Sequence, residues 1–269
     1  MSGNSRRTPV SRTAHRLRIP QGERPVAHCQ SMLPGWDQKR IEAARVCVVG
    51  AGGLGSEVAL NLVQCGIGTI DLIDPDMVEP SNLNRQFFKP KQVGKNKALA
   101  LAENVVEYGA LGTAVHAYPV YVQEFLEQAA AVDFDLFVVG VDNDHARLAA
   151  SDFCIERSVP LVNIGLANDG SGFEILVQER RGPCLRCWWG KREPKATPCG
   201  GVPVDRTLAA MAAAMGCHAG VEQIRQERPP RWTRCIIFPN SAACEASRIT
   251  TRCTRCSLQA TSRIGDVMR

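Results

Sequence analysis

Residues 45–55 read Arg-Val-Cys-Val-Val-Gly-Ala-Gly-Gly-Leu-Gly, and this stretch decides the fold. Its first half is an apolar run of the kind that forms a buried parallel strand. Gly50, Gly52 and Gly55 then complete a G-x-G-x-x-G pattern, which allows a tight turn, close backbone approach to phosphate and close helix packing. Asp74 lies about twenty residues further on, at the end of the next predicted strand, where a ribose-binding carboxylate belongs. The stretch therefore predicts a strand–turn–helix unit that binds a nucleotide.

A polar insertion after the second predicted strand distinguishes the chain from an ordinary dinucleotide-binding domain. Residues 81–86 read Ser-Asn-Leu-Asn-Arg-Gln, which places Asn82 and Arg85 in one loop, and Lys97 follows just before an Ala-rich helix. Arg offers a planar fork to phosphate oxygens, and Lys offers a compact positive charge. Two such cations are useful when charge develops during attack on a phosphate. The insertion favours ATP over NAD as the ligand.

Asp142 directly follows a second apolar run, at residues 136–141. In open α/β sheets, ligands bind beyond the carboxyl ends of the strands, where this carboxylate is expected. A carboxylate there suits Mg²⁺ held together with nucleotide phosphates. The alternative is that Asp142 or Asn143 caps the following helix, and the two roles are compatible.

Taken together, these motifs resemble the ThiF/MoeB/HesA family, the prokaryotic relatives of ubiquitin-activating enzymes. The resemblance covers about residues 38–256 and implies ATP- and Mg²⁺-dependent adenylation of the C-terminal glycine of a ubiquitin-like or sulfur-carrier protein. It implies that Asp74 holds the ribose and Asp142 the Mg²⁺. The phosphate ligands that it implies are Asn82, Arg85 and Lys97. The matching residues are Gly50, Gly52, Gly55, Asp74, Asp76, residues 81–86, Gly94, Lys97, Asp142, Asn143 and Arg147.

The resemblance also implies a partner protein ending in Gly-Gly, a homodimer, and a downstream transferase or sulfur donor. Dimeric relatives carry an Arg-Gln pair upstream of the first strand, whose Arg reaches the ATP of the neighbouring subunit. Here the matching pair is Cys29-Gln30, and Arg24 is the nearest alternative cation. The trans-acting contact and the oligomer arrangement are therefore open.

Cysteine usage points to a metal site. The chain has 12 cysteines, and its N-terminus is polar and Arg-rich without the apolar core of a secretory signal. We therefore expect a reducing cytoplasm, where a disulfide scaffold is disfavoured. Cys184 and Cys187 form one C-x-x-C pair, and Cys253 and Cys256 form another. Two such pairs complete a tetrahedral, structural zinc site with no open position, whereas the alternative is a set of free or redox-active thiols.

Cys199 is the candidate catalytic thiol. It lies in residues 195–202, a Pro/Gly-rich stretch typical of an exposed loop. Nearby Lys191, Arg192 and Lys195 favour the thiolate form. In the family, a cysteine in the matching crossover loop receives the acyl group or takes part in sulfur transfer. The alternative is an ordinary loop thiol.

The order of elements predicts a doubly wound, Rossmann-like α/β fold with a mostly parallel sheet, an antiparallel extension and a four-cysteine zinc staple. Strands are expected at residues 46–49, 69–74, 114–119, 136–139 and 160–164, with antiparallel strands at 173–178, 233–238 and 245–250. Helices are expected at residues 54–64, 96–107, 122–130, 144–156 and 205–225.

Residues 1–27 form a basic arm that lacks an apolar period and is expected to be disordered or ordered by a partner. Residues 28–269 are expected to form one adenylation domain with its zinc site and crossover loop. The net charge of +5 is modest and arises mostly in the arm, so nucleic acid is not the expected partner. The sequence has no apolar run long enough for a transmembrane helix.

Three alternative functions remain open at the level of the sequence. An NAD(P)-dependent oxidoreductase explains the Gly-rich turn and Asp74 but gives no role to Arg85, Lys97 or the paired cysteines. A non-catalytic scaffold that binds a ubiquitin-like tail is disfavoured by an intact set of charged residues. A relative that adenylates a tRNA base is disfavoured by the paired cysteines and Cys199. Thiamin, molybdenum-cofactor, tRNA and siderophore pathways, and protein conjugation, are not distinguished.

Overall fold

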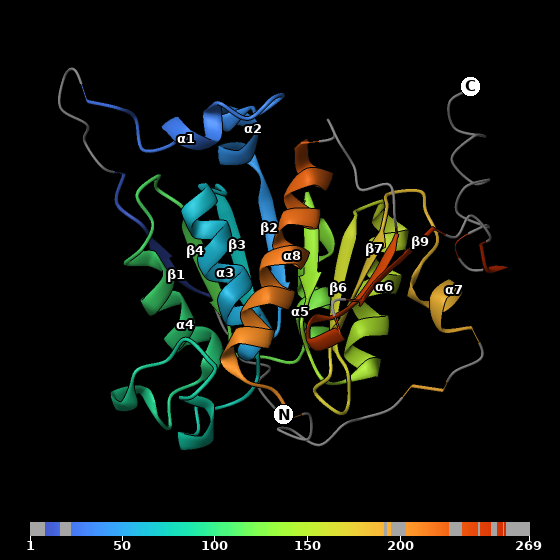
Figure 1. The fold of residues 1–269 in the computed structure, drawn as a ribbon. Coiled ribbons are helices and arrows are strands. Elements are labelled where there is room, and N and C mark those ends of the chain that lie inside the picture. Colours follow the sequence, from blue (N-terminus) through green and yellow to red (C-terminus); the bar gives the residue numbers. More distant parts are fainter. Residues whose placement is uncertain are drawn as a thin grey trace, which may run out of the picture.

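The computed structural model describes residues 9–16, 23–190, 193–194, 203–225, 233–241, 243–248, 252–254 and 256. Within these residues, nine strands form a single sheet in the order β1-β4-β3-β2-β5-β6-β7-β8-β9 (Figure 1). The strands are β1 Val10–Thr13, β2 Arg45–Val49, β3 Thr69–Ile73, β4 Ala114–Tyr118, β5 Leu136–Val139, β6 Leu161–Leu166, β7 Phe173–Gln178, β8 Arg234–Phe238 and β9 Ala243–Ser247.

The sheet has a parallel centre and antiparallel ends. Strands β4, β3, β2, β5 and β6 run parallel, β1 is antiparallel to β4, and β7, β8 and β9 extend the other edge as an antiparallel series. The predicted α/β class with a mostly parallel sheet and an antiparallel extension is confirmed. The predicted strands coincide with the observed ones to within two residues at each end, except that β9 ends at Ser247, three residues before the predicted end at residue 250.

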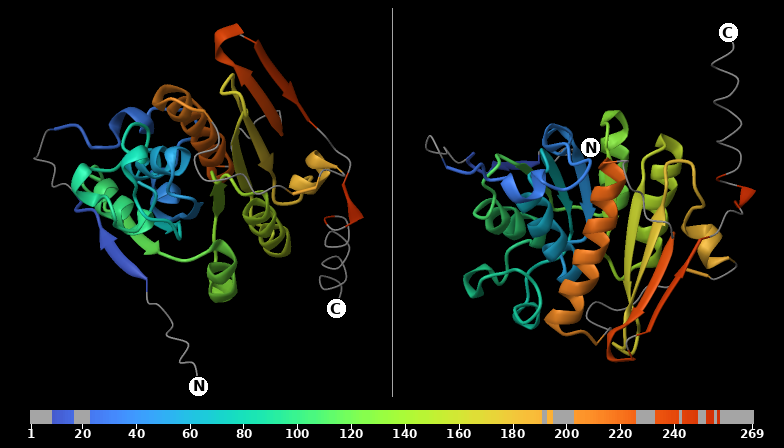
Figure 2. Two further views of the ribbon diagram at one scale, coloured as in Figure 1. Left: turned by 90° about the horizontal axis from the view of Figure 1, so that it is seen from below. Right: turned by 45° about the horizontal axis from the view of Figure 1, so that its top comes forward.

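Helices cover both faces of the sheet, as the doubly wound prediction requires. One face packs against α3, α4 and α8, and the other against α5, α6 and α7 (Figure 2). The helices are α1 His28–Ser31, α2 Gln38–Ala43, α3 Gly53–Cys65, α4 Lys97–Val106, α5 Val122–Gln128, α6 Asp144–Arg157, α7 Leu185–Trp189 and α8 Arg206–Arg225. Short 3₁₀ turns lie at Pro80–Asn82, Pro90–Gln92, Ala129–Ala131 and Pro239–Ser241.

Side-chain caps fix where α2, α4 and α6 begin. Asp37 accepts hydrogen bonds from two amides of α2, Asn96 from the amide of Leu99 in α4, and Asn143 from two amides of α6. Such caps satisfy N–H groups that have no partner inside the helix. Because Asn143 is the cap of α6, the neighbouring Asp142 carboxylate is not used for that role.

The N-terminal arm contains a strand that the sequence did not indicate. The prediction of an arm without regular structure is wrong for Val10–Thr13, which form β1 at the edge of the sheet. All four of its side chains are exposed, so the strand is held by backbone pairing with β4 and by an ion pair from Arg12 to Glu103. Edge pairing of this kind leaves no hydrophobic period in the sequence.

The described helices include none that is long and apolar enough to span a bilayer.

Candidate nucleotide site and four-cysteine cluster

A cavity of about 760 Å³ opens beyond the carboxyl ends of the parallel strands. This is where the topology of an open α/β sheet places its ligands. Most of the residues predicted for the nucleotide site line this cavity, namely Gly50, Gly52, Asp74, Arg85, Lys97 and Asp142. Gly55 and Asn82 are described but do not line it, and each has a structural contact instead.

The three glycines of the turn act in three different ways. Gly50 has φ +96°, a conformation that side chains disfavour. A Cβ at Gly55 would lie 1.8 Å from the carbonyl oxygen of Gly50, so this glycine allows α3 to pack against the turn. A Cβ at Gly52 would meet only the end of Gln86, 3.9 Å away, so this backbone is open to the cavity beside the first turn of α3. The amides of such a turn attract phosphate.

Asp74 lies at the carboxyl end of β3 and is buried. Its Oδ2 accepts a hydrogen bond from the amide of Ala51 at 2.7 Å, and its Oδ1 accepts one from the amide of Asp76 at 2.8 Å. Burial raises the pKa of Asp74 to about 6, an effect that the positive charge of Lys97 and the two amides oppose. The carboxylate is therefore held rigidly at the Gly-rich turn, the position expected for ribose binding.

Lys97 is the first residue of α4 and is also buried. Its Nζ lies 2.9 Å from Oδ2 of Asp76. Asn96 fixes this position, because its side-chain amide donates to the carbonyl oxygens of Asp74 and Asp76. The start of α4 is thus tied to the end of β3, which holds the Lys97 cation against the cavity.

The polar insertion presents Arg85 while Asn82 holds the loop. Oδ1 of Asn82 accepts a hydrogen bond from the amide of Glu79 at 3.0 Å, so its carbonyl oxygen faces the loop. The Arg85 guanidinium donates to the carbonyl oxygen of Ser81 and to Oδ1 of Asn84. These contacts orient the guanidinium but use only part of its five-donor fork.

Gln86 is a site residue that sequence reasoning missed. It is buried, it lines the cavity, and its Oε1 has no hydrogen-bond partner. A buried acceptor without a partner is destabilising, so a donor from a bound ligand fits here. The sequence did contain a signal for Gln86, because this residue directly follows Arg85 in the polar insertion.

Arg147, one of the residues that match the family, forms with Asn163 a buried network beneath the Asp142 loop that the sequence did not predict. The Arg147 guanidinium donates to Oδ1 of Asn163, to the carbonyl oxygen of Ile164 and to that of Val141. It thereby fastens the end of β5 to β6. Asn163 could have been noticed as the polar residue in an otherwise apolar strand.

Asp142 itself is exposed at the cavity wall, directly after Val141. The network around Arg147 positions its backbone, and Asn143 takes the capping role. Oxygen donors are the ligands that Mg²⁺ prefers, so an accessible carboxylate at this edge fits that ion.

The antiparallel strands close the far end of the cavity with a different set of side chains. Ile236 and Phe238 of β8, Phe173 and Glu174 of β7, and Trp189 of α7 line it. Strand β8 is four strands from β2, a separation of about 19 Å at about 4.8 Å per strand. The cavity is therefore polar and cationic at the glycine turn and largely apolar at the opposite end.

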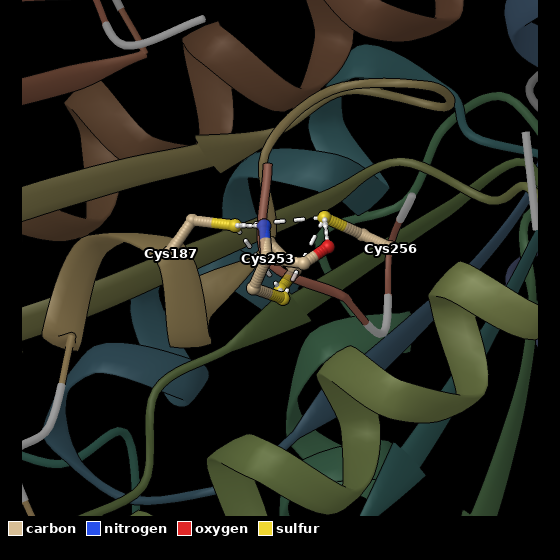
Figure 3. Close-up of side chains that lie close together, drawn as sticks. Cys187, Cys253 and Cys256 are labelled. Atoms are coloured by element: carbon tan, nitrogen blue, oxygen red, sulfur yellow. Dashed lines mark hydrogen bonds between the residues drawn. The ribbon is translucent and has the colours of Figure 1, made fainter. Parts of the chain in front are cut away.

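The four paired cysteines converge as predicted. Cys184 and Cys187, at the start of α7, meet Cys253 and Cys256, which follow β9. Figure 3 shows three of them, Cys187, Cys253 and Cys256. Four of the Sγ–Sγ distances are 3.5, 3.6, 3.7 and 3.7 Å. A tetrahedron with Zn–S bonds of about 2.3 Å requires sulfur atoms about 3.8 Å apart. The donor set and its spacing therefore fit zinc.

The cluster anchors α7 next to the cavity. The amide of Cys253 donates to Sγ of Cys187, and Arg186 makes a two-point ion pair with Asp152 of α6. Trp189 ends the helix and reaches the cavity wall. The cysteine cluster thus holds one wall of the candidate site in place.

Cys199 lies outside the described residues, as do Lys191, Arg192 and Lys195. Cys29, the residue that the sequence suggested in place of the Arg of dimeric relatives, is exposed on α1.

A glycine-rich turn, two carboxylates and two cations surround one cavity of an α/β protein that also has a four-cysteine cluster, and this arrangement fits a nucleotide phosphate. The chain belongs to the ThiF family, whose model matches residues 27–226.

Individual relatives agree with this assignment. The chain is 32% identical over 190 residues to the adenylyltransferase and sulfurtransferase MOCS3-2 of Zea mays, covering 70% of this chain and 39% of that protein. It is 34% identical over 161 residues to SUMO-activating enzyme subunit 2 of Dictyostelium discoideum, covering 59% of this chain and 23% of that protein. The chain therefore spans well under half the length of these relatives.

Solved structures share the fold. The E. coli MccB structure with ATP superimposes with a TM-score of 0.65 at 21% identity, covering 81% of this chain and 67% of that one. The complex of MccB with MccA-N7isoASN gives a TM-score of 0.70 at the same identity, covering 81% and 68%.

Proposed function

We propose that this chain catalyses ATP-dependent adenylation of the C-terminal glycine of a ubiquitin-like or sulfur-carrier protein. The observation that carries the proposal is the convergence of Arg85, Lys97 and Asp142 on one cavity beside the glycine turn. Membership of the ThiF family and the names of the relatives, an adenylyltransferase and sulfurtransferase and a SUMO-activating enzyme subunit, support it. Hydride transfer would leave the two cations without a role.

The reaction joins the carrier's terminal carboxylate to the α-phosphorus of ATP, and pyrophosphate leaves. In our proposal Asp74 accepts hydrogen bonds from the ribose, and the amides beside Gly52 receive phosphate oxygens. Arg85 and Lys97 stabilise the negative charge that grows on the phosphates. Asp142 would hold Mg²⁺, which supplies further neutralisation of the triphosphate when bound.

The apolar end of the cavity would receive the carrier's tail. Ile236 and Phe238 lie on β8, four strands from β2 and its glycine turn, and Trp189 ends α7 towards the β9 edge of the sheet (Figure 1). A tail entering there reaches the nucleotide end with its carboxylate foremost. We also propose that the four-cysteine cluster holds a structural zinc. A homodimer, a cytoplasmic location and a downstream transferase or sulfur donor remain predictions.

Pyrophosphate exchange tests the adenylation proposal. With Mg²⁺, ATP and a carrier protein ending in Gly-Gly, labelled pyrophosphate should enter ATP, and the same carrier without its Gly-Gly should not support exchange. Asp142→Ala should abolish exchange, and Arg85→Ala should lower it on the order of 100-fold, about 3 kcal/mol of transition-state stabilisation. Unchanged exchange in Asp142→Ala would rule out the role given to this residue.

Matched controls exist for both variants. Asp133 is exposed just before β5, at the strand end opposite to Asp142, and Arg40 is exposed on α2. Asp133→Ala and Arg40→Ala should exchange like the natural chain. Equal losses in the controls would mean that the variants act through stability.

Transfer of the activated acyl group to Cys199 is the second step that we propose. An acyl adenylate is open to attack by a thiolate, with loss of AMP. Cys199→Ala should keep exchange but lose a thiol-sensitive adduct with the carrier, whereas Cys29→Ala, which removes the exposed thiol of α1, should retain the adduct. If the adduct forms normally without Cys199, the product passes directly to a separate acceptor.

A further inference from the structure

A second pair of thiols lies in the hairpin of β8 and β9, apart from the four-cysteine cluster. The Sγ atoms of Cys235 and Cys244 are 3.6 Å apart. In the strand register, Cys235 faces Ala246 and Cys244 faces Ile237, so the two cysteines occupy diagonal positions on one face. A disulfide bond of about 2.0 Å needs the sulfurs to approach by roughly 1.6 Å.

The two thiols differ in access. Cys235 is 1% exposed and lies beside Ile175 of the core, whereas Cys244 is exposed on β9. Strand β9 is the edge of the sheet, and all five of its side chains are exposed. An edge strand has a partner on one side only, so it can shift to bring Cys244 closer to Cys235.

We propose that Cys235 and Cys244 form a redox-active dithiol site whose co-reactant is a low-molecular-weight disulfide. The Cys244 thiolate attacks one sulfur of the disulfide, the S–S bond breaks, and one thiol leaves. Cys235 then gives up its proton and attacks Cys244 Sγ, which forms the Cys235–Cys244 bond and releases the second thiol. Two electrons and two protons pass from the protein to the co-reactant, so the step balances.

The order of attack follows from the environment. Burial raises the pKa of Cys235 to about 12, and the neighbouring thiol of Cys244 adds to the effect. The thiolate is the reactive form, so the buried Cys235 is a poor first nucleophile. Once Cys244 carries the mixed disulfide, Cys235 attacks within the same hairpin, where the effective concentration is in the millimolar range or higher.

The position of Cys235 and Cys244 determines which parts of the molecule a disulfide bond between them would connect. Ile236 and Phe238 of β8 line the cavity, and β9 leads towards Cys253 of the four-cysteine cluster. A disulfide would fasten the edge strand to the strand that forms the cavity wall. This inference is independent of the adenylation proposal, because it rests only on the hairpin thiols.

Digestion with trypsin isolates the two thiols in one peptide, whose mass reports whether the disulfide has formed. Cleavage after Arg234 and Arg248 releases residues 235–248, which contain Cys235 and Cys244 and no other cysteine. The native full-length chain is incubated with oxidised glutathione, freed of excess reagent, alkylated after unfolding and digested. We expect this peptide to lack two hydrogens and to carry neither alkyl group nor glutathione. The closed form should exceed the glutathione adduct by on the order of tenfold.

Cysteine variants check the order of attack. Cys235→Ser should leave a stable glutathione adduct on Cys244, and Cys244→Ser should leave Cys235 unmodified. Cys29, which is also exposed, should keep its glutathione because it has no thiol partner in the described residues. A doubly alkylated peptide, or a dominant adduct on Cys244 of the natural chain, would overturn the proposal. The natural chain alone decides this if either variant fails to fold.

Discussion

The parallel and antiparallel halves of the sheet contribute different chemistry to one cavity. The parallel half supplies polar and charged groups, including Asp74, Lys97 and Asp142, each at the carboxyl end of a strand or at a helix start beside it. The antiparallel half supplies mainly apolar side chains, among them Trp189 and Phe238. In the proposed reaction, the first half performs the phosphate chemistry and the second half selects the tail.

The two halves also differ in what holds them. Carboxyl ends of neighbouring parallel strands meet at the same edge, so the topology alone gathers functional residues there. Antiparallel strands alternate in direction, so their carboxyl ends do not meet at one edge. Here the far wall of the cavity depends on α7, which the four-cysteine cluster anchors. The parallel half is thus assembled by its fold, and the antiparallel half requires a cross-link between distant segments.

The largest effect should come from breaking that cross-link. Cys187→Ser should release zinc and lower the free energy of unfolding by several kcal/mol, because structural zinc binds with on the order of 10 kcal/mol. Zinc content by elemental analysis and urea unfolding measure the two changes. Cys65→Ser, at a half-buried thiol of α3 outside the cluster, should keep its zinc. A natural chain without zinc, and with all four thiols titratable while folded, would remove the basis of this prediction.

Local sequence motifs account for the parts of the molecule that could be predicted, and tertiary contacts for the parts that could not. The glycine turn, Asp74 and the four-cysteine cluster follow from local motifs, and the structure brings each set together. Strand β1 could not be predicted, because its exposed Val-Ser-Arg-Thr sequence buries no side chain and is held by backbone pairing with β4 and one surface ion pair. Gln86 and Arg147 stand in recognisable motifs, but the unpaired Oε1 of Gln86 and the hydrogen bonds of Arg147 depend on tertiary packing, so the sequence did not predict these roles.

A smaller effect is expected in the parallel half, where Asp74 should make the free energy of unfolding depend on pH. Asp74 has its pKa raised by burial from 3.8 to about 6. The folded chain therefore takes up a proton between these values that the unfolded chain does not, so this group destabilises the fold as pH rises through the window. Relative to Asp74→Asn, the natural chain should gain about 1 to 2 kcal/mol in unfolding free energy from about pH 7.5 to about pH 5.

Urea unfolding of both chains at the two pH values measures this difference, and the other titrating groups cancel because the two chains share them. A constant difference would mean that Asp74 is solvated, and a decrease would mean that Lys97 outweighs burial. The first result would make Asp74 an ordinary surface carboxylate and the second an ion-paired one, and either would weaken the contrast between the two halves.

The smallest effect is expected from changing Trp189, which should alter the KM for the carrier but not the KM for ATP. Trp189→Ala should raise the KM for the carrier on the order of tenfold, about 1.4 kcal/mol, because a large apolar wall is removed from the tail end. The KM for ATP should not change, since Trp189 ends α7, which lies towards the β9 edge of the sheet, whereas the glycine turn joins β2 to α3 (Figure 1). Trp189→Phe should restore most of the carrier binding. Trp188 packs under Arg234 and does not line the cavity, so Trp188→Phe is the matched control and should leave both constants unchanged. Steady-state exchange rates at varied carrier and varied ATP distinguish the two constants. An equal rise in both would show that the halves are not separable, and that α7 positions the nucleotide as well as the tail.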